Sequence, residues 1–233
     1  MRRPRRLVAV VSAGTLLALV GAVVLRLTLS GAYLRYVQNG MRPWLLIAGV
    51  ALVLLGALNM ARSWRRRTAE DEHEQPREGW LLLAPIAALL LVAPPPLGSY
   101  GVDRASPVNV RAAGHGYAAL PRTNGPAVMS LLEYGQRAFD GDGRTVRDAT
   151  ISLTGFVAGG ADASSFRLAR YQIACCAADA SAMIVKVVGI SGAAPSRDQW
   201  VTVTGRFHPT GGDIPELSAL TVQPITAPED PYE

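Results

Sequence analysis

The chain of 233 residues is long enough for a membrane region and one modest folded domain. Its net charge of +5 would suit a nucleic-acid-binding protein, but the charge is unevenly divided along the chain. Residues 1–103 hold 12 arginines against 6 acidic residues, whereas residues 104–233 hold 11 basic against 12 acidic residues. The positive charge therefore belongs to the N-terminal hydrophobic region, where membrane topology explains it better than phosphate binding does.

Three hydrophobic segments occupy the first hundred residues. Leu7–Leu25 and Pro43–Ala61 are each 19 residues long without a charge, close to the roughly 20 apolar residues that a helix needs to cross a bilayer. Trp80–Val102 is uncharged over 23 residues, although Pro85 and Pro94–Pro96 interrupt it, so a buried or interfacial helix is the alternative there. Arginines precede the first segment, as in a signal peptide, but the segment is longer than the apolar part of a typical signal peptide and lacks a clear cleavage site. We therefore predict that it is a retained helix.

The arginines between these segments predict which helix ends face the cytoplasm. Four precede the first segment and five lie between the second and third, against three between the first and second. Because Lys and Arg gather on the cytoplasmic side of membrane proteins, the N-terminus and the second loop are expected inside. A transmembrane region over residues 1–102, with spans at about 7–25, 43–61 and 80–101, then places the rest of the chain outside; two spans would place it inside. We expect a multi-pass cell-membrane protein with a cytoplasmic N-terminus and an extracytoplasmic C-terminal domain.

Beyond the transmembrane region the sequence predicts a linker and a small β-rich domain. Residues 103–125 are rich in Gly, Pro, Ala and Asn and are predicted to be the linker. Pro126–Phe139 has the apolar spacing of a short helix. The alternation of β-strands follows, over Ala149–Ala158, Ser165–Ile173, Met183–Val188, Gln199–His208 and Leu220–Ile225. For residues 126–233 we therefore expect one short helix and an all-β domain, either a five-stranded OB-like barrel or a sandwich.

The two cysteines of the chain, Cys175 and Cys176, are adjacent and lie just past the second predicted strand. One interpretation is structural, since cysteine is often buried as a small apolar side chain. A second is redox chemistry through a strained disulfide between neighbours in an oxidising compartment. A third is a metal site for zinc or copper with Cys175, Cys176 and Asp179 as ligands. Zinc usually takes four ligands, and His115, in the predicted linker, and His208 are the only histidines after the transmembrane region. All three interpretations stay open at the level of sequence.

Enzymatic motifs do not emerge from the sequence. We find no phosphate-binding glycine loop with a lysine, no HExxH and no GxSxG. Nucleic-acid binding would need a basic, aromatic-lined face, and the predicted domain is slightly acidic. The sequence therefore favours a non-enzymatic protein that does not bind nucleic acid.

Several segments of the chain resemble the YcgQ-type family of uncharacterised membrane proteins. In the membrane region these are SGAYLRYV (30–37) and GWLLL (79–83); in the domain they are LTGFV (153–157), FRLAR (166–170), IACCAADA (173–180), WVTVTG (200–205) and PEDPYE (228–233). The family is described as the small subunit of a two-component membrane permease complex. The resemblance implies a larger polytopic permease-type partner, with this chain as an accessory rather than the pore.

The leading hypothesis is therefore a membrane-anchored accessory subunit of a permease or transport complex, whose outer β domain presents a Cys-Cys-x-x-Asp site. Its expected partners are the larger polytopic protein and membrane lipid. The alternative hypothesis is a stand-alone thiol-based protein that binds zinc or copper or works in redox chemistry.

Overall fold

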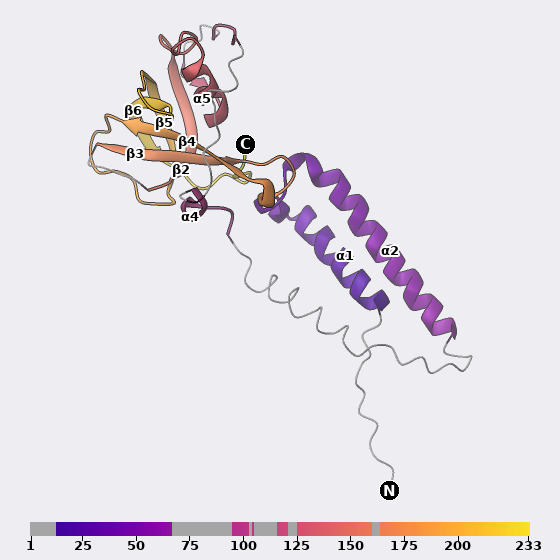
Figure 1. Ribbon diagram of the computed structural model, residues 1–233. Coiled ribbons are helices and arrows are strands. Elements are labelled where there is room, and N and C mark those ends of the chain that lie inside the picture. The colour runs from indigo at the N-terminus through magenta and orange to yellow at the C-terminus, as the bar shows by residue number, and fades with distance from the viewer. Residues whose placement is uncertain (1–12, 67–94, 103, 105–115, 121–124, 160–163) are drawn as a thin grey trace. The chain divides into compact units, whose positions relative to one another are not determined.

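The computed structural model describes residues 13–66, 95–102, 104, 116–120, 125–159 and 164–233. These residues form two compact units, a pair of apolar helices and a β-barrel domain (Figure 1). Leu34–Gln38 belongs to the barrel unit, although in sequence it lies between the two helices.

The helical unit contains α1 (Ala13–Leu29) and α2 (Arg42–Arg66), joined through the short 3-10 turns η1 (Ala32–Arg35) and η2 (Asn39–Met41). Glycines bring α1 and α2 close together. A Cβ atom at Gly56 would lie 2.6 Å from the carbonyl oxygen of Gly14, and one at Gly21 would lie 2.8 Å from that of Gly49. The two pairs show that the helices run antiparallel, and close backbone approach through small residues is typical of membrane helices.

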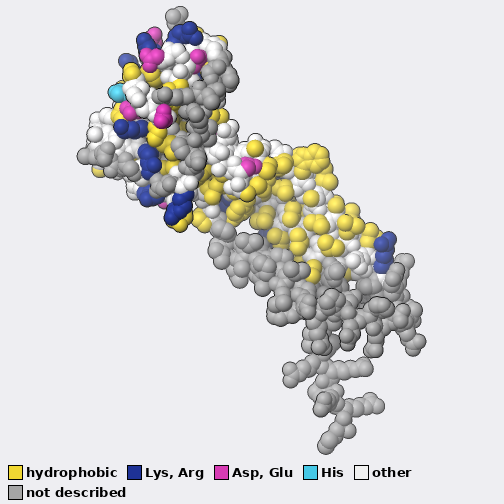
Figure 2. All heavy atoms as spheres, in the orientation of Figure 1, with side chains coloured by type: hydrophobic (Ala, Val, Ile, Leu, Met, Phe, Trp, Pro, Cys, Tyr) yellow, Lys and Arg dark blue, Asp and Glu magenta, His cyan; other side chains and the backbone are white. Residues whose placement is uncertain are grey.

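The outward surface of α2 is apolar. Its exposed side chains include Trp44, Ile47, Val50, Leu54, Leu55 and Leu58, and Figure 2 shows hydrophobic side chains covering the visible surface of the helical unit. The stretch Asn39–Arg62 is the one helix among the described residues that is long and apolar enough to cross a membrane, and the apolar stretch Gly14–Leu29 is shorter. The predicted span at 43–61 falls within α2. Residues 7–12 of the first span and 80–94 of the third lie outside the described residues.

The barrel domain confirms the predicted set of five strands and selects the barrel over the sandwich. The strands are β2 (Thr150–Val157), β3 (Ser165–Gln172), β4 (Ser181–Val188), β5 (Trp200–His208) and β6 (Glu216–Pro224). Their order is β2-β3-β4-β6-β5, and β5 pairs again with β2 to close the barrel. The β4–β6 pair is parallel and the other four pairs are antiparallel.

The predicted helix Pro126–Phe139 proved shorter than expected, because its first residues form a strand. Ala127–Val128 is extended as β1 and pairs in parallel with β2. Helix α5 begins only at Leu131 and ends at Phe139. Ser130 caps it, because its hydroxyl accepts a 2.9 Å hydrogen bond from the Glu133 N–H, which otherwise has no partner in the first turn.

Two hydrophobic clusters stabilise the barrel domain. In the larger one α5 packs on the barrel, where Leu131 and Tyr134 are fully buried among side chains of β2 to β6. The smaller one surrounds Phe156, whose ring packs against those of Tyr171 and Trp200. The short helix α4 (Ser99–Val102) contributes the buried Val102 to this second cluster. The C-terminal end of the predicted third hydrophobic segment, residues 96–102, is thus part of the folded barrel domain.

Candidate functional site

The two cysteines lie on the turn that connects β3 to β4. β3 ends at Gln172, the chain bends at Ala174 and Cys175, and the 3-10 turn η5 (Ala177–Asp179) leads into β4. Cys175 is exposed and Cys176 is partly exposed, and both are free thiols. Neither side chain belongs to the core, so the structure does not support the interpretation of a buried structural pair.

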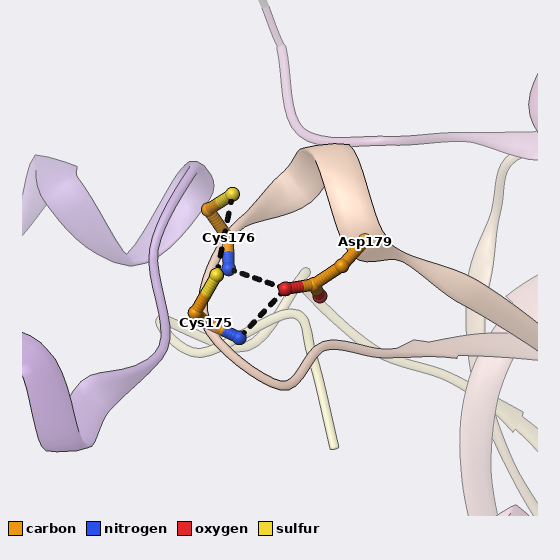
Figure 3. Close-up of side chains that lie close together, drawn as sticks. All are labelled: Cys175, Cys176 and Asp179. Atoms are coloured by element: carbon orange, nitrogen blue, oxygen red, sulfur yellow. Dashed lines mark hydrogen bonds between the residues drawn. The ribbon is translucent and has the colours of Figure 1, made fainter.

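Asp179 fixes this turn from within. Its carboxylate accepts hydrogen bonds from the backbone N–H groups of Ala174 at 2.8 Å, Cys175 at 2.9 Å and Cys176 at 3.3 Å (Figure 3). A hydrogen bond from the Cys175 side chain and these backbone donors lower the pKa of Asp179 to about 2. The carboxylate is therefore ionised throughout the neutral range, and it holds the peptide that carries both thiols.

The two sulfurs lie side by side. The Cys175 and Cys176 Sγ atoms are 3.6 Å apart, and the ligand atoms of Cys175, Cys176 and Asp179 all lie within 4.8 Å of one another. Hydrogen bonding to Asp179, and secondarily to Cys176, raises the pKa of Cys175 to about 12. Cys175 is thus a thiol at neutral pH. A reactive redox or nucleophilic cysteine needs the opposite shift, toward the thiolate.

This sulfur separation fits a single tetrahedral metal ion. Two thiolates bound at 2.3 Å with tetrahedral angles are about 3.8 Å apart, close to the observed 3.6 Å. An ion with two thiolates on opposite sides would hold them at twice the metal–sulfur distance. A disulfide would require the sulfurs to approach to about 2.05 Å. The separation is that of two thiols in contact, and it is also compatible with two thiolates on one tetrahedral ion.

The histidines do not complete the ligand set within the described residues. His208 lies at the end of β5, where its Nδ1 is 3.2 Å from a carboxylate oxygen of Glu216. It is absent from the group formed by Cys175, Cys176 and Asp179, and His115 lies outside the described residues. A zinc ion on the two thiolates would thus have coordination positions left for Asp179, for water or for a partner.

The connection between the two apolar helices pairs with the cysteine turn, which the sequence did not indicate. Val37 and Cys176 form an antiparallel bridge. On one side of it the Gln38 N–H donates to the Cys175 carbonyl at 3.1 Å, and on the other the Ala177 N–H donates to the Tyr36 carbonyl at 2.7 Å. All of these residues belong to the barrel unit.

The segment Asp230–Glu233 supports the same region from the other side. Glu233 pairs with β3, since its N–H donates to the Tyr171 carbonyl at 2.9 Å and its own carbonyl accepts from Ile173 at 3.3 Å. The Tyr232 hydroxyl donates to the Arg35 carbonyl at 2.7 Å. The segment thus contacts both β3, which leads into the cysteine turn, and the helix connection.

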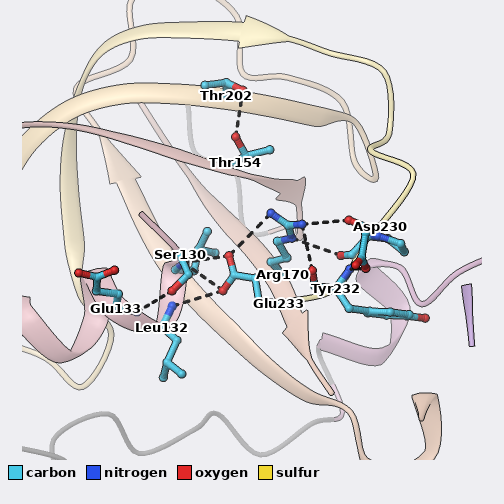
Figure 4. A network of polar contacts seen from close by, with 11 residues as sticks. Ser130, Leu132, Glu133, Thr154, Arg170, Thr202, Asp230, Tyr232 and Glu233 are labelled. Carbon is cyan, nitrogen blue, oxygen red and sulfur yellow. Dashed lines mark hydrogen bonds and ion pairs between the residues drawn. The ribbon is translucent and has the colours of Figure 1, made fainter. Parts of the chain in front are cut away.

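The Glu233 side chain joins this segment to α5 (Figure 4). Its carboxylate accepts the Leu131 N–H at 3.0 Å and lies 3.8 Å from the Arg170 guanidinium, which also donates to the carbonyls of Asp230 and Tyr232. Burial raises the pKa of Glu233, although the Leu131 N–H and Arg170 oppose that rise. This network anchors the Asp230–Glu233 segment to β3 and α5.

The fold and site define a closed five-stranded β-barrel with a vicinal dithiol turn, in a chain that also contains a pair of apolar helices. Residues 143–233 match the family model described as the DUF1980 C-terminal domain, an uncharacterised family. The match covers all five barrel strands, the cysteine turn and the Asp230–Glu233 segment. It begins after α1, α2, α4 and α5. Neither the curated proteins nor the solved structures gave a match.

Proposed function

We propose that this chain is a membrane-anchored accessory subunit whose barrel domain binds zinc through Cys175 and Cys176. The observation that supports this most is the 3.6 Å separation of two accessible free thiols on a turn held by Asp179. Each thiol that binds zinc becomes a thiolate and releases its proton to solvent. Two protein thiolates leave the ion an open coordination shell, which suits an ion that is passed on rather than a structural ion enclosed by four ligands.

An accessory role in transport is supported by the resemblance to the permease-subunit family and by the helices. Residues 43–61 of α2 contain no charged side chain, and intramembrane charges are the usual mark of an ion path. We infer that the path belongs to a larger polytopic partner. The barrel itself is inferred to be of the OB type, because five short strands closed with one parallel pair match that architecture better than an up-and-down barrel.

An extracytoplasmic location for the barrel is supported by the helix connection. Because Leu34–Gln38, in the connection between α1 and α2, is grouped with the barrel unit, we infer that the connection and the barrel share one side of the membrane. The arginine-rich stretches, before α1 and after residue 61, are expected in the cytoplasm. If both helices span, the connection and the barrel lie outside.

The location is tested by labelling intact cells with a membrane-impermeant thiol reagent, using permeabilised cells as the control. Cys175 and Cys176 are the only cysteines of the chain, so any labelling reports on the barrel. Labelling of intact cells is the expected result. Labelling only after permeabilisation would place the barrel in the cytoplasm.

Zinc binding is tested by titrating the full chain, in detergent or nanodiscs, with zinc in competition with a chelator of known affinity. One ion per chain is expected, and Cys175→Ser together with Cys176→Ser should abolish binding while the barrel still unfolds at its usual temperature. Ala178→Ser, which adds a hydroxyl to an exposed position of the same turn, is the matched control and should bind normally. Equal binding by the double cysteine variant would refute the site.

A further inference from the structure

The backbone of the two cysteines is fully hydrogen-bonded, and one of its partners comes from the helix connection. Asp179 accepts both cysteine N–H groups through its carboxylate and donates its own N–H to the Cys176 carbonyl at 3.0 Å. The remaining group, the Cys175 carbonyl, accepts from Gln38. The peptide that carries the thiols is therefore fixed on one side by its own turn and on the other by Tyr36–Gln38.

The two thiols need this support in order to face one ion. Successive side chains of a regular strand point to opposite faces, yet the two Sγ atoms here are 3.6 Å apart. The chain bends at Ala174 and Cys175 and becomes extended again at Cys176, where it pairs with Val37. Loss of that pairing would leave an exposed turn with more conformations, of which only a fraction would bring both sulfurs together.

We propose that Tyr36–Gln38 is a positioning element of the zinc site, so that zinc binding and the pairing of the helix connection with the cysteine turn stabilise each other. This inference rests on the proposed zinc function. The affinity of a site falls in proportion to the fraction of molecules in the competent conformation. Since binding linkage is reciprocal, zinc must strengthen the pairing by the same factor by which the pairing strengthens zinc binding. The pairing of the connection between α1 and α2 with the cysteine turn would then be stronger in the zinc-bound protein than in the zinc-free protein.

The ends of the connection favour such a response. The Tyr33 hydroxyl donates to the Asn39 side-chain oxygen at 3.0 Å, which closes the loop that contains Leu34–Gln38. The Tyr232 hydroxyl holds the Arg35 carbonyl. The connection is thus short and hydrogen-bonded at several points. We therefore expect a change in its pairing with the cysteine turn to alter the adjoining ends of α1 and α2.

The test removes one hydrogen bond without touching the thiols. Gln38→Pro deletes the N–H that binds the Cys175 carbonyl, whereas Gln38→Ala keeps it and serves as the matched control. In the full chain in nanodiscs, Gln38→Pro should bind zinc roughly three- to tenfold more weakly than Gln38→Ala, the effect of one net hydrogen bond. Tyr232→Phe, which frees the Arg35 carbonyl, should shift the affinity in the same direction.

A second measurement, on the wild-type chain, tests the inference even if the proline variant does not fold. Hydrogen exchange of the wild-type chain should show slower exchange at Gln38 and Ala177 when zinc is added, and the double cysteine variant should show no change. If the wild type binds zinc but exchange at both amides is unaltered and the two Gln38 variants bind equally, the inference is refuted and the zinc site stands. If the wild type binds no zinc, the proposed function fails and the inference fails with it.

Discussion

Zinc affinity should depend strongly on pH because of Cys175. Its pKa of about 12 keeps the thiol protonated at every pH near neutrality. Binding as a thiolate must release that proton, so the affinity rises about tenfold for each pH unit from this residue alone. Between about pH 6.5 and about pH 7.5, zinc should therefore bind at least about ten times more tightly at the higher pH. The sign is fixed, since acid returns the proton and expels the metal.

The assay is a chelator competition on the full chain at both pH values, with calorimetry in two buffers of different ionisation enthalpy to count the protons released. At least one proton per zinc is expected from the wild type. Cys175→Ser should bind more weakly and release about one proton fewer, because its hydroxyl has no comparable acidity. An affinity that is unchanged across this pH range, or a Cys175→Ser variant with an unaltered proton count, would refute the assignment of Cys175 as a thiolate ligand.

Three further changes test other parts of the structure. Gly56→Leu should separate α1 from α2, because a Cβ there would lie 2.6 Å from the Gly14 carbonyl; a cross-linking yield between the helices equal to that of the wild type would contradict this. Tyr134→Phe should lower the free energy of unfolding of the barrel by about 1–2 kcal/mol, because the Glu216 carbonyl loses the buried donor that the Tyr134 hydroxyl provides; an unchanged urea midpoint would contradict it. Burial raises the pKa of Glu233, so the folded state binds more protons than the unfolded state between the ordinary and the raised pKa. Stability should fall as pH rises through that window, and Glu233→Gln should flatten this dependence; an identical slope in the variant would exclude Glu233 as its source.

The barrel strands could be predicted from short runs rich in β-branched and aromatic residues between turns, although strict alternation of buried and exposed side chains is clear only in β5. In β5, Val201, Val203 and Phe207 are buried, and the residues between them are more exposed apart from Gly205. The ends were harder to predict. β6 begins at Glu216 rather than at Leu220, because the pairing with β4 and β5 extends through polar residues. β1 was missed because two residues carry no periodicity, and its parallel pairing with β2 is a long-range contact.

The cysteine site was predicted only in part. Adjacency of Cys175 and Cys176 just past a strand, with Asp179 three residues on, identified the candidate residues. Sequence alone left the buried, redox and metal interpretations open, because exposure, sulfur separation and the pKa of Cys175 depend on the folded turn. The pairing of Val37 with Cys176 joins residues 139 positions apart, and no local sequence pattern indicates such a pairing. One hint existed, since both residues lie within segments that carry the family resemblance.

X-ray absorption at the zinc edge, on the full chain loaded with one equivalent of zinc, tests the central claim most directly. We expect two sulfur neighbours at about 2.3 Å, with oxygen or nitrogen completing the shell at about 2.0–2.2 Å. The sulfur shell should vanish in the variant that carries both Cys175→Ser and Cys176→Ser. A zinc ion surrounded only by oxygen and nitrogen in the wild type would contradict the account.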